Sequence, residues 1–270
     1  MAKDCVGFIG LGDMGEPMAA CVLAAGYPVV SCANRSRKAI DALQAKGLEE
    51  VSSPAEVGAR ADILITCVLD EAQTEHVLRG PNGALSRLKP GAVVIITSTL
   101  SPGYCQALAE AAAAGGIDLI DCPVSGARPR AEQGTLTLIC GGDPAIIERC
   151  RSVLESMGSI HHCGPVGMGQ IAKLVNQGML YGILKLLGEG RALASAYGMD
   201  LDTLMGVLSQ SMGNSAAGEN WEMFAAIWPH AAKLGQKDLN LCIEAARARG
   251  VAMPLIEARR HMSWEMPDDA

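Results

Sequence analysis

The first 165 residues alternate between short apolar runs and longer segments in which apolar residues recur at helical spacing. The apolar runs have the length of buried strands: Cys5–Ile9, Val29–Cys32, Asp62–Val68, Ala92–Ile96, Ile117–Ile120, Thr135–Cys140 and Ile160–His162. Helix-like segments lie between them: Gly15–Ala25, Ser36–Ala45, Glu71–Arg79 and Pro102–Ala114. This alternation predicts an α/β fold with a doubly wound, mainly parallel sheet that carries helices on both faces.

The pattern changes at Gly164-Pro165, after which no strand signal remains. A long helical pattern runs from Gly167 to about Tyr197 without a proline. Further helical segments are Leu201–Ser211, Ala217–Ala226, Ala231–Arg249 and Pro254–Met262. We therefore predict two domains, with a sheet domain over residues 1–165 and an all-α domain over residues 166–270 that begins with a long interdomain helix.

A glycine-rich turn follows the first predicted strand, where Gly10, Gly12 and Gly15 form the pattern G-x-G-x-x-G. Gly10 permits the tight turn, Gly12 lets the backbone approach a pyrophosphate, and Gly15 lets the helix pack close to the sheet. The helix N-terminus offers free N–H groups to the phosphates. In this strand-turn-helix context the pattern predicts a dinucleotide-binding domain of the Rossmann type.

The end of the second predicted strand indicates which dinucleotide binds. An acidic residue there would accept hydrogen bonds from the ribose 2′-hydroxyl of NAD, but the segment from Ser31 onward has no acid before Asp41. A guanidinium would instead attract a 2′-phosphate. We predict NADP(H) in preference to NAD(H), read by Asn34, Arg35 and Ser36. The alternative is a solvated basic helix start, which would oppose the helix dipole.

Composition narrows the possible partners. Of 270 residues, 49% are hydrophobic and 19% charged, which excludes a disordered chain. The net charge of −7 argues against a nucleic-acid surface and favours small-molecule partners. No apolar run reaches the roughly 18 residues that span a bilayer, and no signal peptide is visible, so we expect neither a membrane partner nor export. Ten scattered cysteines without a Cys-x-x-Cys pair suit a reducing cytoplasm.

No metal site is expected. His161-His162-Cys163 brings three metal-binding residue types together, but consecutive side chains converge poorly on one ion. We interpret it as the last strand before the boundary.

Several ordered blocks together resemble the β-hydroxyacid dehydrogenase family, which includes 3-hydroxyisobutyrate dehydrogenase, tartronate semialdehyde reductase and 6-phosphogluconate dehydrogenase. The blocks are GLGDMGEPMA (10–19), Ser98-Thr99 within TSTLSP, DCPVSGA (121–127) followed by Gly134-Thr135-Leu136, GMGQIAKLVNQ (167–177) and Lys237-Asp238-Leu239. They cover nearly the whole chain in the order of the family. The resemblance implies a Rossmann domain, an all-α domain and an active site between the two.

Lys173 is the proposed proton carrier. It lies in a helix that is otherwise poor in charge, where an ammonium suits proton donation to a carbonyl oxygen that receives a hydride. Its position alone fits a snorkelling surface lysine equally well. The family carries its catalytic lysine at this position, so the resemblance favours the catalytic role.

The same resemblance implies the remaining site residues. Asn176 would hold the substrate hydroxyl or orient Lys173, with Gln177 beside it, and Ser125, Gly126 and Ala127 would grip the substrate carboxylate. Lys237 would reach the cleft between cofactor and substrate, although a surface charge beside Asp238 is the alternative. The expected cofactor contacts are Gly10, Leu11, Gly12, Met14, Gly15, Val68, Leu69, Thr99 and Lys237.

These residues imply an NADP-dependent oxidoreductase that transfers a hydride between the nicotinamide and a short 3-hydroxy acid or semialdehyde. Candidate substrates are compounds of the 3-hydroxyisobutyrate, tartronate semialdehyde or succinic semialdehyde type. One alternative is an imine reductase, although such relatives usually carry Asp or Tyr where Lys173 stands. Another is a catalytically silent NADPH-binding protein. The chain is short for the family, from which we expect a homodimer or homotetramer that covers exposed helices.

Two further features leave alternatives open. Arg128 and Arg130 follow the DCPVSGA block at 121–127, which we call the substrate block, and would either bind a second anion on the substrate or lie in solvent beside Glu132. Trp221, Phe224 and Trp228 recur at helical spacing and indicate a core or a subunit interface rather than a ligand site.

Overall fold

A computed structural model describes residues 3–34 and 36–265. The chain forms two compact units, Met1–Lys173 and Leu174–Ala270, which meet inside one long helix. The first turns of that helix belong to the sheet unit because their side chains and backbone hydrogen-bond to strand ends there. The boundary near residue 165 stays a prediction.

The first unit is built on a nine-stranded sheet. Its strands are β1 (Val6–Ile9), β2 (Val29–Cys32), β3 (Glu49–Val51), β4 (Ile63–Thr66), β5 (Val93–Ile96), β6 (Asp118–Asp121), β7 (Val124–Ser125), β8 (Leu136–Gly141) and β9 (Gly158–Gly164). They follow the order β3-β2-β1-β4-β5-β6-β8-β7, and β9 pairs with β8. Strands β1 to β6 pair in parallel, whereas β8 runs antiparallel to β6 and β7. The predicted doubly wound, mainly parallel sheet is confirmed.

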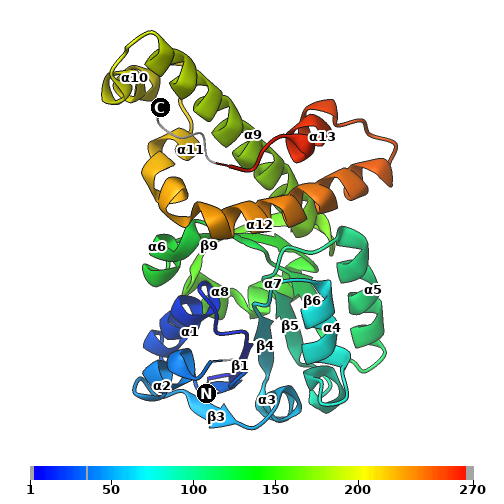
Figure 1. Ribbon diagram of the computed structural model, residues 1–270. Helices are drawn as coiled ribbons and strands as arrows, with labels where there is room; N and C mark the ends of the chain where they lie inside the picture. Colours follow the sequence, from blue (N-terminus) through cyan, green and yellow to red (C-terminus); the bar gives the residue numbers. More distant parts are fainter. Residues whose placement is uncertain (1–2, 35, 266–270) are drawn as a thin grey trace. The chain divides into compact units, whose positions relative to one another are not determined.

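Helices cover both faces of this sheet (Figure 1). The helices of the first unit are α1 (Gly15–Ala24), α2 (Lys38–Gln44), α3 (Pro54–Arg60), α4 (Glu71–Arg79), the 3-10 helix η1 (Ala84–Arg87), α5 (Pro102–Ala113), α6 (Ala127–Glu132), α7 (Pro144–Arg149) and α8 (Arg151–Glu155). Alternate residues of a strand enter opposite cores: Ile63 and Ile65 pack with α1 and α2, and Leu64 packs with α3, α4 and α5. Burial of both faces explains why these strands are continuous apolar runs.

The structure adds elements that the apolar pattern did not predict. Strand β3 reads Glu-Glu-Val and lies at the edge of the sheet, where one side is open to solvent and no apolar run is required. Helix α3 follows it, with Pro54 in its first turn and the Ser53 hydroxyl capping the N–H of Glu56. Strand β7 and helices α6, α7 and α8 were also missed, since each spans only two to six residues.

The second unit is helical, and among residues 174–265 the structure contains no strand. Its helices are α9 (Met168–Ala196, which begins in the first unit), α10 (Leu201–Ser209), α11 (Ala216–Glu219), α12 (Trp221–Arg247) and α13 (Pro254–His261). No helix of the described part of the chain is long and apolar enough to cross a membrane.

The predicted break between residues 226 and 231 is wrong. Helix α12 continues through Pro229 although a proline inside a helix removes a hydrogen bond. Trp228 and Ala231, on either side of the proline, are buried in the core of the unit, so tertiary packing outweighs the local cost. Trp221 is buried in the same core and Phe224 packs against it, which supports the core interpretation of these aromatic residues.

The structure also places the cysteines and the His161-His162-Cys163 segment. All ten cysteines are free thiols, and only Cys163 is exposed. His161 and His162 lie on β9 and pair with β8, which confirms their interpretation as a strand. The described residues contain no group of three or more His, Cys, Asp or Glu side chains that could hold a metal ion.

Candidate functional site

The glycine-rich turn links β1 to α1 where the strand order reverses between β1 and β4. Gly10 has a φ of +100°, and a Cβ there would overlap the carbonyl oxygen of Cys67. A Cβ at Gly15 would overlap the carbonyl oxygen of Gly10. At Gly12, by contrast, a Cβ would meet no atom of the described protein within 4 Å. Gly10 and Gly15 therefore shape the turn, and Gly12 leaves room beside it, which fits a dinucleotide pyrophosphate.

The loops after β4 and β5 meet next to this turn. The Ser98 hydroxyl accepts a hydrogen bond from Val68 N at 3.0 Å and donates one to Val68 O at 2.7 Å. The Val68 side chain in turn lies against Gly10. The structure thus brings together Val68 and Ser98-Thr99 with the glycine-rich turn, at the carboxyl ends of parallel strands, where open α/β sheets bind ligands. Leu69 follows in the same loop and is exposed.

The segment after β2 holds the predicted nucleotide-selecting residues. Asn34 and Ser36 are exposed, and Arg35 lies outside the described residues. Arg37 makes a bidentate ion pair with Glu50, in which its two terminal nitrogens lie 2.7 and 2.9 Å from the carboxylate oxygens. This interaction lowers the pKa of the Glu50 carboxyl. Glu50 lies on β3 and pairs with Ser31 on β2. Sequence reasoning missed the Glu50 carboxylate because it did not predict β3. This carboxylate is paired with Arg37.

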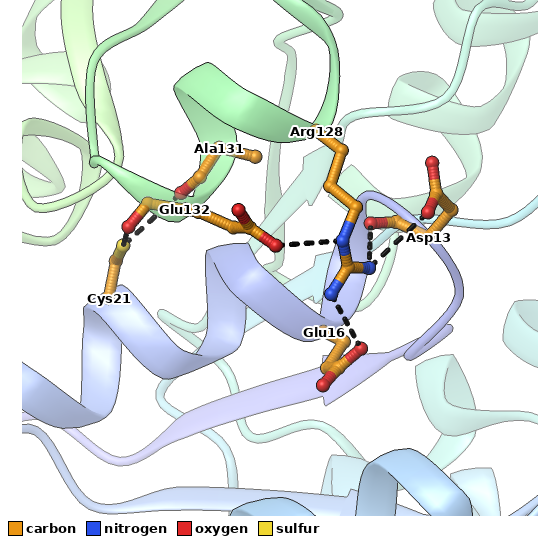
Figure 2. Close-up of polar contacts among 6 residues, drawn as sticks. All are labelled: Asp13, Glu16, Cys21, Arg128, Ala131 and Glu132. Carbon is orange, nitrogen blue, oxygen red and sulfur yellow. Dashed lines mark hydrogen bonds and ion pairs between the residues drawn. The ribbon is translucent and has the colours of Figure 1, made fainter. Parts of the chain in front are cut away.

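Arg128 joins the substrate block to the glycine-rich turn (Figure 2). From α6 its guanidinium donates to the Asp13 carbonyl at 2.9 Å, and it pairs with Glu16 on α1 at 3.2 Å and with Glu132 at 2.8 Å. These contacts favour the interpretation of Arg128 as a partner of Glu132 over a free anion receptor, and add contacts that the sequence did not indicate. Arg130 is exposed, and the structure shows no ion pair for it among the described residues.

Lys173 is buried, with a relative exposure of 8%, so it is not a snorkelling surface lysine. Its Nζ donates to the carbonyl oxygen of Val124 at 2.8 Å. Val124 and Ser125 form β7, and Gly126, with a φ of +136°, turns the chain into α6. The ammonium therefore lies beside the loop that the sequence assigned to the substrate carboxylate. Ala127 in that loop has a positive φ of 54°, which favours glycine.

The second unit contains a connected set of polar side chains. Asn176 Nδ2 donates to Gln177 Oε1 at 3.1 Å, and Gln177 Nε2 donates to Asp238 Oδ2 at 2.6 Å. Lys237 Nζ lies 3.0 Å from Asp238 Oδ1. In the alternative interpretation Lys237 is a surface charge beside Asp238; the side chain of Lys237 is 24% exposed, and Asp238 is 3% exposed. Sequence reasoning did not assign Asp238 to the site, because Gln236, Lys237 and Asn240 around it give no local sign that this acid is buried.

Asp121 is a second buried acid that sequence reasoning left out. It ends β6, and its carboxylate accepts hydrogen bonds from the N–H groups of Gly167 at 2.6 Å and Gln170 at 2.7 Å. Burial raises the pKa of the Asp121 carboxyl to about 6, while these backbone donors act in the opposite direction. The carboxylate anchors the start of the helix that carries Lys173.

Comparison with known proteins covers both units. Residues 5–168 match the family described as the NAD binding domain of 6-phosphogluconate dehydrogenase. Residues 167–268 match the NAD-binding domain of NADP-dependent 3-hydroxyisobutyrate dehydrogenase. The chain is 35% identical to 2-(hydroxymethyl)glutarate dehydrogenase of Eubacterium barkeri, over 93% of this chain and 85% of that one. It is also 35% identical to 3-hydroxyisobutyrate dehydrogenase of Pseudomonas aeruginosa, over 95% and 90%.

The chain is also similar in fold to a solved structure of a related enzyme. The 3-hydroxyisobutyrate dehydrogenase from Salmonella typhimurium superposes with a TM-score of 0.86 at 28% identity, covering 99% of this chain and 98% of that one. Fold and glycine-rich turn define a dinucleotide-binding oxidoreductase of the Rossmann class. More specifically, the chain belongs to the NAD(P)-dependent β-hydroxyacid dehydrogenase family, which confirms the resemblance drawn from its motifs.

Proposed function

We propose that the protein transfers a hydride between NADPH and a short 3-hydroxy acid or its semialdehyde, with Lys173 as the general acid in reduction. The observation that carries the proposal is the buried Lys173 ammonium, fixed at Val124 O beside the Ser125 loop. When bound, the nicotinamide supplies the hydride at its C4. Lys173 gives a proton from Nζ to the carbonyl oxygen, and in oxidation the neutral amine takes it back from the hydroxyl.

The other residues of the site bind and orient the substrate. The Ser125 hydroxyl and the N–H groups of Gly126 and Ala127 hold the carboxylate. Asn176 binds the hydroxyl, and its contact with Gln177 connects it to the carboxylate of Asp238. Lys237, whose ammonium is paired with Asp238, adds positive charge for an anionic substrate or for the cofactor.

NADP(H) is the proposed cofactor. The segment from Cys32 to Ser36 contains no carboxylate that would repel a 2′-phosphate, and it includes Arg35, a residue type that binds phosphate through its guanidinium. Two acids that follow in the chain, Asp41 and Glu50, are both paired with Arg37.

The proposal is tested by following oxidation of the reduced cofactor with a panel of semialdehydes, each assayed with NADPH and with NADH. We expect turnover of at least one 3-oxo acid or semialdehyde, with kcat/KM at least about tenfold higher with NADPH, since a charge-assisted phosphate contact contributes about 1.5–3 kcal/mol. Equal efficiency with both cofactors would contradict the NADP assignment. Cyclic imines belong in the panel, because turnover of imines alone, or silence on every compound, would overturn the hydroxy-acid assignment.

We also propose a homodimer or homotetramer. Helix α10 has no buried residue although Leu204, Met205 and Val207 are apolar, and on α9 Leu186 and Leu193 are more than 60% exposed. Exposed apolar side chains favour association, and a second copy of the chain would present the same side chains in return. Light scattering at micromolar concentration should give at least twice the mass of 28.1 kDa, and a monomer would refute this assembly.

A further inference from the structure

Gln170 is a fully buried side chain in the first turn of α9. Its Oε1 accepts a hydrogen bond from Leu100 N at 3.0 Å, and its Nε2 donates one to Ser98 O at 2.9 Å. The two bonds therefore flank Thr99 on both sides. An amide suits this position because it presents one acceptor and one donor in a single plane, whereas a carboxylate lacks the donor.

The loop that Gln170 holds is the one beside the glycine-rich turn. Ser98, whose carbonyl Gln170 binds, uses its own hydroxyl to bind both the N–H and the carbonyl of Val68. Gln170 is thus the point where α9 connects to the loops after β4 and β5. Since Ser98 and Leu100 are both buried, each broken bond would leave a backbone group without a hydrogen-bond partner, which is unfavourable.

The same turn of α9 is also fixed to β6. The Asp121 carboxylate accepts from the N–H groups of Gly167 and Gln170. Gly141 and Gly169 leave the space for it, because a Cβ at either position would meet its oxygens. The backbone of Gln170 therefore depends on Asp121, and its side chain depends on the Ser98–Leu100 loop.

Lys173 lies three residues after Gln170 and so on the same side of the helix, one turn further on. We propose that Gln170 is a positioning residue that holds the Lys173 helix in register with the Ser98–Leu100 loop. The inference rests on the proposed function, in which the reacting carbonyl must meet the hydride and the Lys173 proton together. A shift of about 1 Å between two such elements can slow a reaction by about 10²-fold.

The test variant is Gln170→Met, which keeps the length of the side chain and removes both hydrogen bonds. We expect kcat to fall by about 10- to 100-fold while the Kd for NADPH changes by less than about threefold. Amide hydrogen exchange in residues 97–101 should become faster, because Leu100 N loses its acceptor. If the methionine variant does not fold, Gln170→Glu replaces it, since it keeps the acceptor for Leu100 N and loses only the donor to Ser98 O.

The matched control is Gln106→Met. Gln106, on α5, also donates through Nε2 to a backbone carbonyl, that of Val166 just before α9, at 3.1 Å, and in the described part of the chain it makes no hydrogen bond to residues 98–100. The kcat of Gln106→Met, and its rate of amide hydrogen exchange in residues 97–101, should stay within about twofold of the values for the unmodified protein. Equal losses in both variants, or unchanged kcat in Gln170→Met, would overturn the positioning role.

Failure of the proposed function is separable from failure of this inference. If the unmodified protein turns over no compound of the panel, the proposed function fails. The exchange of the Leu100 amide still decides whether Gln170 holds the loop, and unchanged exchange in Gln170→Met overturns the inference whatever the activity.

Discussion

Replacing Lys173 with alanine should lower kcat by about 10²- to 10⁴-fold, the usual loss for one general acid, and leave NADPH affinity nearly intact. The ammonium is buried and directed at Val124 O, next to the substrate loop, and the glycine-rich turn that would bind the dinucleotide is built from other residues. Loss of Lys173 should therefore affect the proton transfer and not the binding of the cofactor.

Steady-state kinetics and fluorescence titration with NADPH measure the two effects separately. Lys185→Ala is the matched control, because Lys185 lies on the same helix, is 22% exposed and pairs with Glu189 at 3.5 Å. It should retain turnover. Small primary amines should partly restore activity to Lys173→Ala by occupying the space of the missing side chain. Retained turnover in Lys173→Ala would assign the proton donor to another group.

The second large effect is expected in the glycine-rich turn, where two similar substitutions should fail for different reasons. Gly15→Ala should destabilise the fold by about 1–3 kcal/mol or more, because its Cβ would overlap the backbone carbonyl of Gly10. Gly12→Ala should change stability by less than about 0.5 kcal/mol, since its Cβ would meet no atom of the described protein within 4 Å.

Dinucleotide binding should separate the two variants further. Gly12→Ala is expected to raise the Kd for NADPH by at least about tenfold, because the added methyl group lies where the pyrophosphate must approach the backbone. Thermal unfolding and fluorescence titration of each variant provide the measurements. Unchanged NADPH affinity in a well-folded Gly12→Ala protein would mean that the pyrophosphate does not bind at this turn.

Much of the sheet could be predicted because buried parallel strands carry their own signal. The runs at β4 and β5 are apolar on both faces, and the glycine-rich turn marks the end of β1. The edge strand β3 has no such signal, and Glu49 and Glu50 instead indicate a loop. At Pro229 the local rule predicted a helix end, whereas the burial of Trp228 and Ala231 keeps α12 continuous.

The candidate site divides in the same way. Lys173, Ser125 and the glycines were predicted as site residues because the motifs that contain them resemble those of a known family. Gln170 and Asp121 were not, since their roles lie in bonds to residues distant in sequence: Gln170 binds Leu100, 70 positions away, and Asp121 binds Gly167, 46 positions away. Arg128 was left between two interpretations for the same reason, because its partner Asp13 is 115 positions away.

By itself, the sequence of this protein determined the class of fold, the glycine-rich turn and the family, and it predicted Lys173 as the proton carrier. These follow from local periods and short motifs, in which neighbouring residues supply all the information. Only the tertiary structure decided that Lys173 is buried against Val124, that Arg128 is paired with the cofactor turn and that Gln170 connects the lysine helix to the Ser98–Leu100 loop. Buried hydrogen bonds between distant segments depend on how strand ends are brought together, and no local pattern of residues specifies that arrangement.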